Sequence, residues 1–137
     1  MNYYNTFIAV APDTHATAGV VPPRRAGPPT VAALEYELIS SRPYRLTQEE
    51  VQFAVHVRRQ GIQPERVVTE REQLWADFFA RPIACMRSSP LPKTYGWGLH
   101  FDDQGKVALV PVGGSEYERL AGDPTIEQTR AMRSRRA

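Results

Sequence analysis

Hydrophobic residues recur at helical spacing in the second quarter of the chain. Val31, Leu34 and Leu38 are spaced as on one face of a helix. The preceding Thr30 carries a hydroxyl that can accept a hydrogen bond from the first helical turn. Together these features predict a helix over 31–41.

A wider apolar face follows further along the chain. The helical spacing places four large apolar residues side by side, namely Leu74, Trp75, Phe78 and Phe79. Thr69 and Glu72 have the spacing of a capping box, in which each side chain satisfies a backbone N–H of the other's turn. The sequence therefore predicts a helix over 70–80.

The segment 47–60 supports two interpretations. Apolar residues alternate with others as in a strand, at Val51, Phe53, Val55 and Val57. Against this, Thr47 and Glu50 form a capping box, and Gly61 stands where a helix often ends in a left-handed residue. The terminal signals favour a helix over 48–60, and a strand remains the alternative.

Strand patterns occupy both ends of the chain. Residues 5–10 and 83–87 each form a short, mostly apolar run. The runs 95–101 and 106–112 predict a hairpin, because Gly105 in the connection between them can adopt a positive φ. A capping box at Ser115 and Glu118 predicts a short helix to residue 121, and Pro124 is placed to open a last helix.

These elements predict an α+β fold in one domain, 1–137. A small, mainly antiparallel sheet is expected, with three to four helices packed on one face. A Pro-rich loop at 11–30 separates the first strand from the first helix, and such a long loop is either functional or partly disordered. The expected core is Ile8, Leu34, Leu38, Val51, Val55, Leu74, Trp75, Phe78, Trp97, Leu99, Val107 and Leu109.

Charge and composition narrow the possible partners. The net charge is +2, and the basic character gathers in the C-terminal tail at about 130–137, at Arg130, Arg133, Arg135 and Arg136. Because the rest of the chain is close to neutral, nucleic acid is an unlikely partner, although weak binding through this tail stays an alternative. A single cysteine and the absence of a long apolar N-terminal run predict a cytoplasmic protein that does not enter a membrane.

Several common kinds of chemistry lack their motifs. The chain has no Gly-rich phosphate loop, no dinucleotide fingerprint, no nucleophile elbow and no HExxH or CxxC pair. The three histidines share no metal-ligand spacing. We therefore expect neither a cofactor nor a metal, and whether the protein is an enzyme stays open.

Five short motifs spread over the chain resemble a known family. They are Asn-Tyr-Tyr-Asn-Thr-Phe at 2–7, Leu-Thr-Gln-Glu-Glu-Val at 46–51, Arg-Ser-Ser-Pro-Leu at 87–91, Tyr-Gly-Trp-Gly-Leu-His at 95–100, and Arg-Ala-Met-Arg-Ser at 130–134. The chain resembles a family of bacterial proteins of unknown function and about this length. The resemblance implies a stand-alone bacterial cytoplasmic protein, and it supplies neither a catalytic residue nor a ligand.

Polar and aromatic side chains gather in the segment 85–100. The candidate ligand-binding residues are Arg87, Ser89, Lys93, Tyr95, Trp97 and His100. Gly96 and Gly98 leave space beside them, where a ligand or another backbone can approach. This predicts a non-enzymatic module that binds a small anionic molecule or a protein partner. Alternatively, the glycines permit a bulge and Trp97 anchors the core.

Two further hypotheses use other residues. If the strands 83–87 and 97–101 pair, Cys85 and His100 could serve a small hydrolase or transferase as nucleophile and base. Arg24 and Arg25, in the Pro-rich loop, could close over a ligand, or could simply be solvated.

Overall fold

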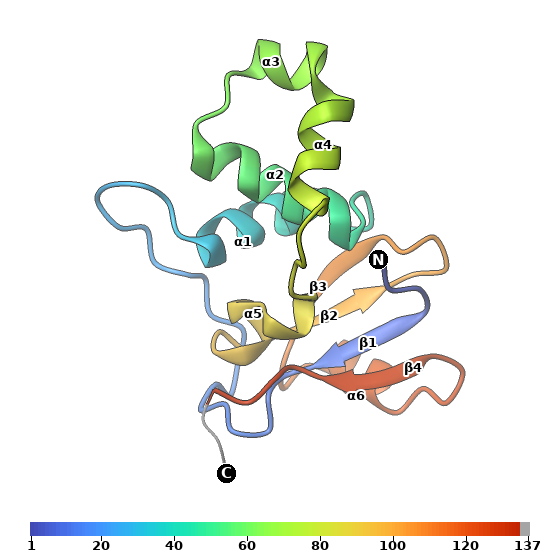
Figure 1. Ribbon diagram of the computed structural model, residues 1–137. Coiled ribbons are helices and arrows are strands. Elements are labelled where there is room, and N and C mark those ends of the chain that lie inside the picture. The colour runs from blue at the N-terminus through green and yellow to red at the C-terminus, as the bar shows by residue number, and fades with distance from the viewer. Residues whose placement is uncertain (135–137) are drawn as a thin grey trace.

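A four-stranded sheet forms the centre of the fold in the computed structural model, which describes residues 1–134 (Figure 1). The strand order is β3-β2-β1-β4. The β3–β2 and β2–β1 pairs are antiparallel, whereas β1 and β4 run parallel. The strands are β1 (Thr6–Ala9), β2 (Trp97–Phe101), β3 (Val107–Pro111) and β4 (Glu127–Arg130).

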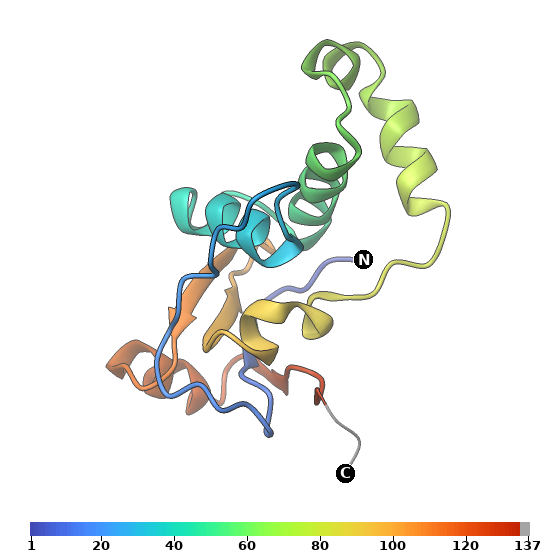
Figure 2. The same cartoon turned by 90° about the vertical axis from the view of Figure 1, so that its left-hand side faces the viewer.

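The combination of this sheet with several helices confirms the predicted α+β class. Most of the helices that pack on the sheet lie on one face, as expected, but one helix also covers the opposite face. Helices α1, α2 and α5 lie on one face, and α6 packs against β1 and β3 from the other (Figure 2). Helices α3 and α4 form an arm that extends away from the sheet. The helices are α1 (Val31–Ser41), α2 (Gln48–Gln60), α3 (Pro64–Thr69), α4 (Arg71–Phe79), the 3-10 turn η1 (Met86–Ser88), α5 (Pro90–Lys93) and α6 (Ser115–Ala121).

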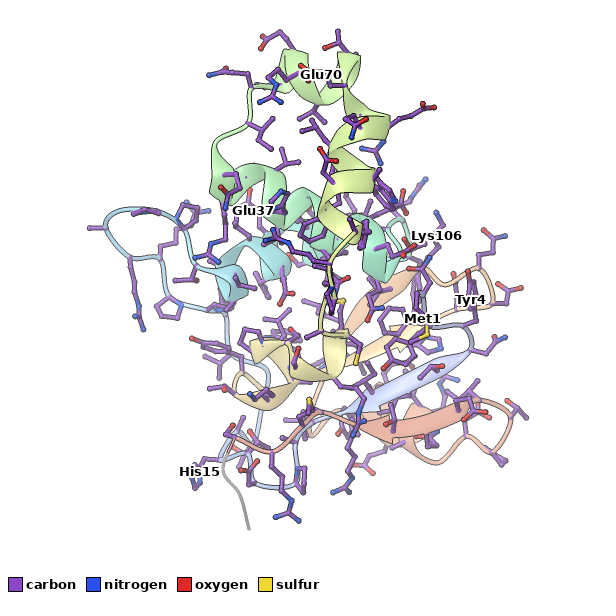
Figure 3. All side chains as sticks on the ribbon, viewed as in Figure 1. Met1, Tyr4, His15, Glu37, Glu70 and Lys106 are labelled. Atoms are coloured by element: carbon purple, nitrogen blue, oxygen red, sulfur yellow. The ribbon has the colours of Figure 1, made fainter. Side chains whose placement is uncertain are left out.

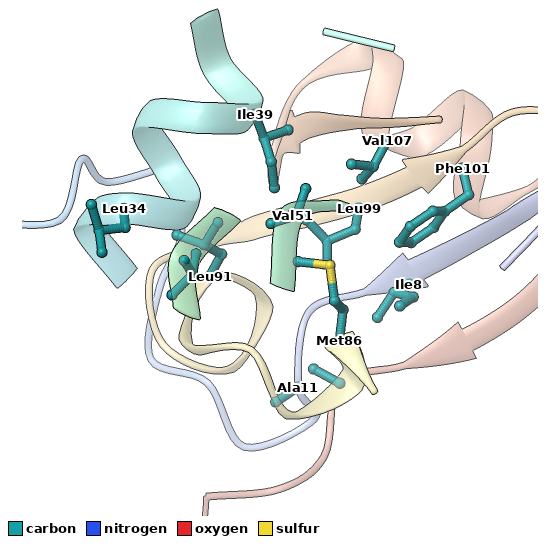
Figure 4. Close-up of a cluster of buried hydrophobic side chains, with 12 residues drawn as sticks. Ile8, Ala11, Leu34, Ile39, Val51, Met86, Leu91, Leu99, Phe101 and Val107 are labelled. Carbon is teal, nitrogen blue, oxygen red and sulfur yellow. The ribbon is translucent and has the colours of Figure 1, made fainter. Parts of the chain in front are cut away.

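Two apolar clusters hold the layers together. The larger one lies between the sheet and α1, α2 and α5, where Ile8, Leu99 and Phe101 of the sheet meet Val51 and Leu91 of the helices (Figure 4). The smaller cluster lies under α6 and consists of Phe7, Val110, Tyr117 and Leu120. Of the expected core, Leu38, Leu74, Trp75, Trp97 and Leu109 are only partly buried.

The helical interpretation of 48–60 is confirmed. Both bonds of the capping box are present, since Thr47 Oγ1 accepts from Glu50 N and Glu50 Oε1 accepts from Thr47 N. Gly61 ends the helix with a left-handed φ of 64°. The two other predicted capping boxes are wrong. Thr69 instead ends α3 and donates back to Glu65, and α6 begins after Gly114 without a side-chain cap.

The predicted strand at 83–87 is wrong, and two glutamine side chains of α2 explain why. Gln52 Nε2 donates to the carbonyl of Ala84 at 2.7 Å, and Gln48 Oε1 accepts from Met86 N at 2.7 Å. These side-chain amides bond to backbone groups that, in a strand, would form hydrogen bonds with a neighbouring strand. The segment therefore runs along α2 and ends in the turn η1.

Two further segments differ from the secondary structure that their prolines suggest. Two prolines in 88–94 are typical of an irregular loop, yet Pro90 and Pro92 lie in the short helix α5, where Pro90 occupies the first position. The helix expected after Pro124 is a strand, β4. Asp123 accepts from Thr125 N at 2.8 Å, which forms a turn, and the chain then pairs with β1.

The Pro-rich loop has two parts with different surroundings. Its first part packs against the sheet, since Val20 N donates to Tyr95 O and Trp97 Nε1 donates to Val20 O. Residues 23–29 are exposed. At the other terminus, Met132 N donates to Arg87 O, so part of the expected tail lies along the fold, and 135–137 lie outside the described residues.

Candidate functional site

A cleft of about 370 Å³ opens between α1, α2, α4 and the segment 82–90. Helix α2 contributes one face, with Gln52, Val55, His56 and Arg59 at helical spacing. Phe78 of α4 closes one side. Most of the accessible lining is apolar, which is typical of small-molecule sites.

Within residues 1–134, one carboxyl side chain lies in the wall of this cleft. Glu35 of α1 is 5% exposed, and burial raises its pKa to about 7, opposed by a hydrogen bond from Ser89. Ser89 Oγ donates to Glu35 Oε1 at 2.7 Å. Glu35 Oε2 makes no hydrogen bond within 1–134, and no fully buried side-chain oxygen of this range lacks one, so Oε2 keeps some exposure. Glu35 itself lines the cleft.

Ser89 holds this arrangement in place. It is the N-cap of α5, and its hydroxyl oxygen accepts from Leu91 N at 3.2 Å while it donates to Glu35. The same oxygen thus caps the start of one helix and orients the carboxyl of another. Because Ser89 is 5% exposed, this bond is shielded from water.

An imidazole shares the cleft with the carboxyl. His56 stacks on the ring of Phe78, with ring centroids 4.3 Å apart and planes 25° apart. Burial lowers the pKa of His56, and the nearby Arg81 lowers it further, so the ring is neutral near pH 7. The cleft therefore combines a neutral aromatic wall with an acid that changes charge near neutral pH.

The only cysteine also lines the cleft. Tyr3 Oη donates to Cys85 Sγ at 3.2 Å. Burial raises the pKa of Tyr3 to about 12, with a further contribution from this hydrogen bond. The tyrosine therefore stays a donor over the physiological pH range.

The six residues singled out from the sequence do not share one hollow. Ser89 lines the cleft, but Arg87 Nε donates to the carbonyl of Arg130, the last residue of β4. Lys93 ends α5. Tyr95 lines a separate hollow of about 290 Å³ with Arg25 and packs against the larger core cluster.

Trp97 and His100 lie on opposite faces of β2. Trp97 faces α1, where its ring lies 5.5 Å from that of Tyr36. His100 lies on the α6 face, with Tyr44 Oη 2.8 Å from its Nδ1, and burial lowers its pKa. Since β2 pairs only with β1 and β3, the proposed pairing of Cys85 with His100 across adjacent strands is wrong.

The two glycines beside Trp97 are approached by the protein itself. A Cβ at Gly98 would lie 2.8 Å from the ring of Phe7. Gly96 has a φ of +79°, and a Cβ there would collide with the carbonyl oxygen of Ala18. The space that these residues leave is therefore filled by the core and by the Pro-rich loop.

Comparison with protein-family models gives one match over the whole chain. A model described as a family of unknown function, DUF6157, covers residues 1–137. The chain belongs to the DUF6157 family. No curated protein matches it. No solved structure matches it either. The site of this DUF6157 member therefore has to be interpreted from its own chemistry.

Two structural findings bear on the partners of this DUF6157 chain. Within residues 1–134, no helix combines the length and apolar character that a membrane span requires. In the same range, no three His, Cys, Asp or Glu side chains are grouped as metal ligands.

Glu35 was missed from the sequence, although a signal for it exists. It lies four residues after Val31 and three before Leu38, on the apolar face that predicted the helix 31–41. An acid inside such a face is buried when the helix packs. Buried acids require a partner or a changed pKa, which marks a candidate site.

Proposed function

We propose that this protein binds a small, largely apolar molecule that carries a basic amine, in the cleft between α1, α2, α4 and the segment 82–90. The observation that carries the proposal is the Glu35 carboxyl, which is almost fully buried, lines the cleft and has one oxygen without a hydrogen-bond partner within residues 1–134. The cleft volume of about 370 Å³ falls in the range of small-molecule sites.

The missing partner of Glu35 indicates the charge of the ligand. Buried carboxylates in proteins are generally paired with a cation, because desolvation disfavours a lone charge. Glu35 receives only the hydroxyl of Ser89, and no cationic side chain of residues 1–134 forms an ion pair with it. A ligand ammonium group at Oε2 would supply this partner.

The same reasoning changes the ligand expected from the sequence. Arg59 also lines the cleft but forms no ion pair with Glu35. An anionic ligand near Glu35 would therefore meet an unpaired carboxylate, so this end of the cleft favours a cationic ligand. The hydroxyl and thiol groups near Glu35 that could act as nucleophiles already have hydrogen-bond partners. Ser89 caps α5, and Cys85 accepts from Tyr3. These commitments favour binding over covalent catalysis, and a reducing compartment such as the cytoplasm suits the single thiol.

Three probes of equal ring size test the proposal, namely benzylamine, benzyl alcohol and benzoate. Binding is measured by isothermal titration calorimetry at about pH 8, where Glu35 is ionised. We expect benzylamine to bind about tenfold or more tightly than either other probe, because a charged hydrogen bond is worth roughly 1.5–3 kcal/mol. Its affinity should fall as the pH drops through the Glu35 pKa of about 7.

The matched variants are Glu35→Gln and Glu37→Gln. Both lie on α1, but Glu37 is exposed and does not line the cleft. Glu35→Gln should abolish the preference for benzylamine and its pH dependence, and Glu37→Gln should keep both. Equal binding of the three probes, or an unchanged preference in Glu35→Gln, would contradict the proposal.

A further inference from the structure

A second hollow lies on another side of α1 and has the opposite charge. It has a volume of about 310 Å³ and is formed by residues 23–30, α1 and the end of α2. Arg24 and Arg25 reach it from the Pro-rich loop, and Arg58 reaches it from the last turn of α2. Among the described residues, Glu37, labelled in Figure 3, is the only acid in its wall.

The three arginines have no carboxylate partner within residues 1–134. Two other exposed arginines of this range do have one, since Arg66 pairs with Glu70 and Arg119 pairs with Glu116, whereas others such as Arg42 also lack one. No such ion pair joins Arg24, Arg25 or Arg58 to Glu37 or to any other described acid. Three guanidinium groups against one carboxylate leave the hollow with an excess of positive charge.

The start of α1 adds to this positive character. Thr30, the N-cap of the 11-residue helix, lines the hollow, and the first turn contains no acidic residue. The first N–H groups of a helix lack intrahelical acceptors and carry partial positive charge. The hollow lies along one side of this first turn, at Thr30, Ala33 and Leu34. Ala33 N and Leu34 N already donate to Thr30, so the helix adds partial positive charge, and the guanidinium groups supply the donors that bind phosphate oxygens.

We propose that this hollow binds the phosphate group of a small phosphorylated molecule, with Arg24, Arg25 and Arg58 as its charged ligands. A phosphate fits better than a single carboxylate, because it carries more charge and offers more acceptor oxygens to three arginines. The site is separate from the cleft at Glu35 and does not depend on the function proposed there. It also gives a role to the exposed half of the Pro-rich loop, which brings two of the three arginines to α1.

Inorganic pyrophosphate serves as the probe, followed by ¹H–¹⁵N correlation spectra at constant ionic strength. We expect saturable shifts of the backbone amides of Ala33 and Leu34, which line the hollow near the start of α1. The double variant Arg24→Ala/Arg25→Ala and the single variant Arg58→Ala should each bind about tenfold more weakly, as expected for loss of charged hydrogen bonds. The spectra also report whether each variant is folded.

Arg42→Ala is the matched control, because Arg42 is exposed and follows the other end of α1. It should bind pyrophosphate as the unmodified protein does. Absence of saturable shifts at α1, or equal weakening by Arg42→Ala, would overturn the proposal. A short oligodeoxythymidine is titrated in parallel. If it binds at this hollow and pyrophosphate does not, the small-molecule ligand is wrong.

Discussion

Helix α1 separates two hollows of comparable volume and opposite chemistry. The cleft, of about 370 Å³, contains the carboxyl of Glu35, and the arginine hollow, of about 310 Å³, is lined by Arg24, Arg25 and Arg58. None of these four groups has an ion-pair partner within residues 1–134. They differ in exposure, since Glu35 is 5% exposed whereas the three arginines are exposed.

This difference in exposure decides what each group does to the protein. Water solvates an exposed guanidinium, so it keeps its charge at little cost in stability. A buried carboxyl loses that solvation, and its charged form is disfavoured. The unpaired groups of the arginine hollow therefore provide binding capacity alone, whereas Glu35 couples its cleft to pH and to the stability of the fold.

The largest expected effect is a dependence of stability on pH that originates at Glu35. Its pKa is about 7 in the folded protein against an ordinary value of 4.5. Between these values the folded state binds more protons, so this stabilisation is complete below pH 4.5 and is lost as the pH rises to about 7. The free energy of unfolding should fall by roughly 2–3 kcal/mol over this range, measured by urea denaturation.

Glu35→Gln isolates this contribution, because the amide keeps the shape and cannot ionise. The free energy of unfolding of the variant, relative to that of the unmodified protein, should rise by about 2–3 kcal/mol between acid and neutral pH. His56, Arg59 and Cys85 also line the cleft and remain unchanged in this comparison. Glu37→Gln, on the exposed side of α1, should leave the pH profile as it is. Parallel pH profiles for Glu35→Gln and the unmodified protein would contradict the assignment.

Local signals in the sequence predicted helices α1, α2, α4 and α6 and the hairpin, although only one of the three expected capping boxes forms. The Thr47–Glu50 capping box and Gly61 outweighed the alternating apolar pattern of 48–60, because caps depend on backbone geometry next to them in the chain. The hairpin of β2 and β3 followed from the turn at Gly105, whose φ is +77°. Both features are set by neighbouring residues, so the sequence alone reveals them.

The failures arose where distant residues decide the local structure. The segment 83–87 resembles a strand, but Gln48 and Gln52 of α2 take its hydrogen bonds. Likewise, β4 forms because β1 has a free edge beside it, which the sequence after Pro124 does not indicate. Such choices depend on tertiary contacts, which a local pattern cannot contain.

The candidate site was predicted only in part for the same reason. Ser89 was included, and it lies in the cleft. His100 was grouped with it because both fall within sixteen residues, yet the alternation of β2 places His100 on the α6 face. Glu35 is 54 residues from Ser89 in sequence, and only the packing of α1 against α5 brings the two together.

A smaller effect is expected from Ser89→Ala, which tests how the cleft carboxyl is held. The variant loses the N-cap of α5 and the hydrogen bond to Glu35, so unfolding should require about 1–2 kcal/mol less. Because the bond from Ser89 lowers the Glu35 pKa, its loss should move the carboxyl titration to higher pH. Side-chain ¹³C NMR of Glu35 measures this midpoint. Ser88→Ala is the control, since the Ser88 hydroxyl donates to Cys85 O instead.

The smallest effect is expected in the arginine hollow. Arg58 is exposed, has no ion-pair partner within residues 1–134, and its guanidinium contributes to stability only through the C-terminal end of α2. Arg58→Ala should therefore change the free energy of unfolding by no more than about 0.5 kcal/mol, equally at acid and neutral pH. Urea denaturation of Arg58→Ala and Glu35→Gln under the same conditions compares the two effects on the free energy of unfolding directly. A loss as large as the Glu35 effect would show that Arg58 is structural, and the distinction between the two hollows would fail.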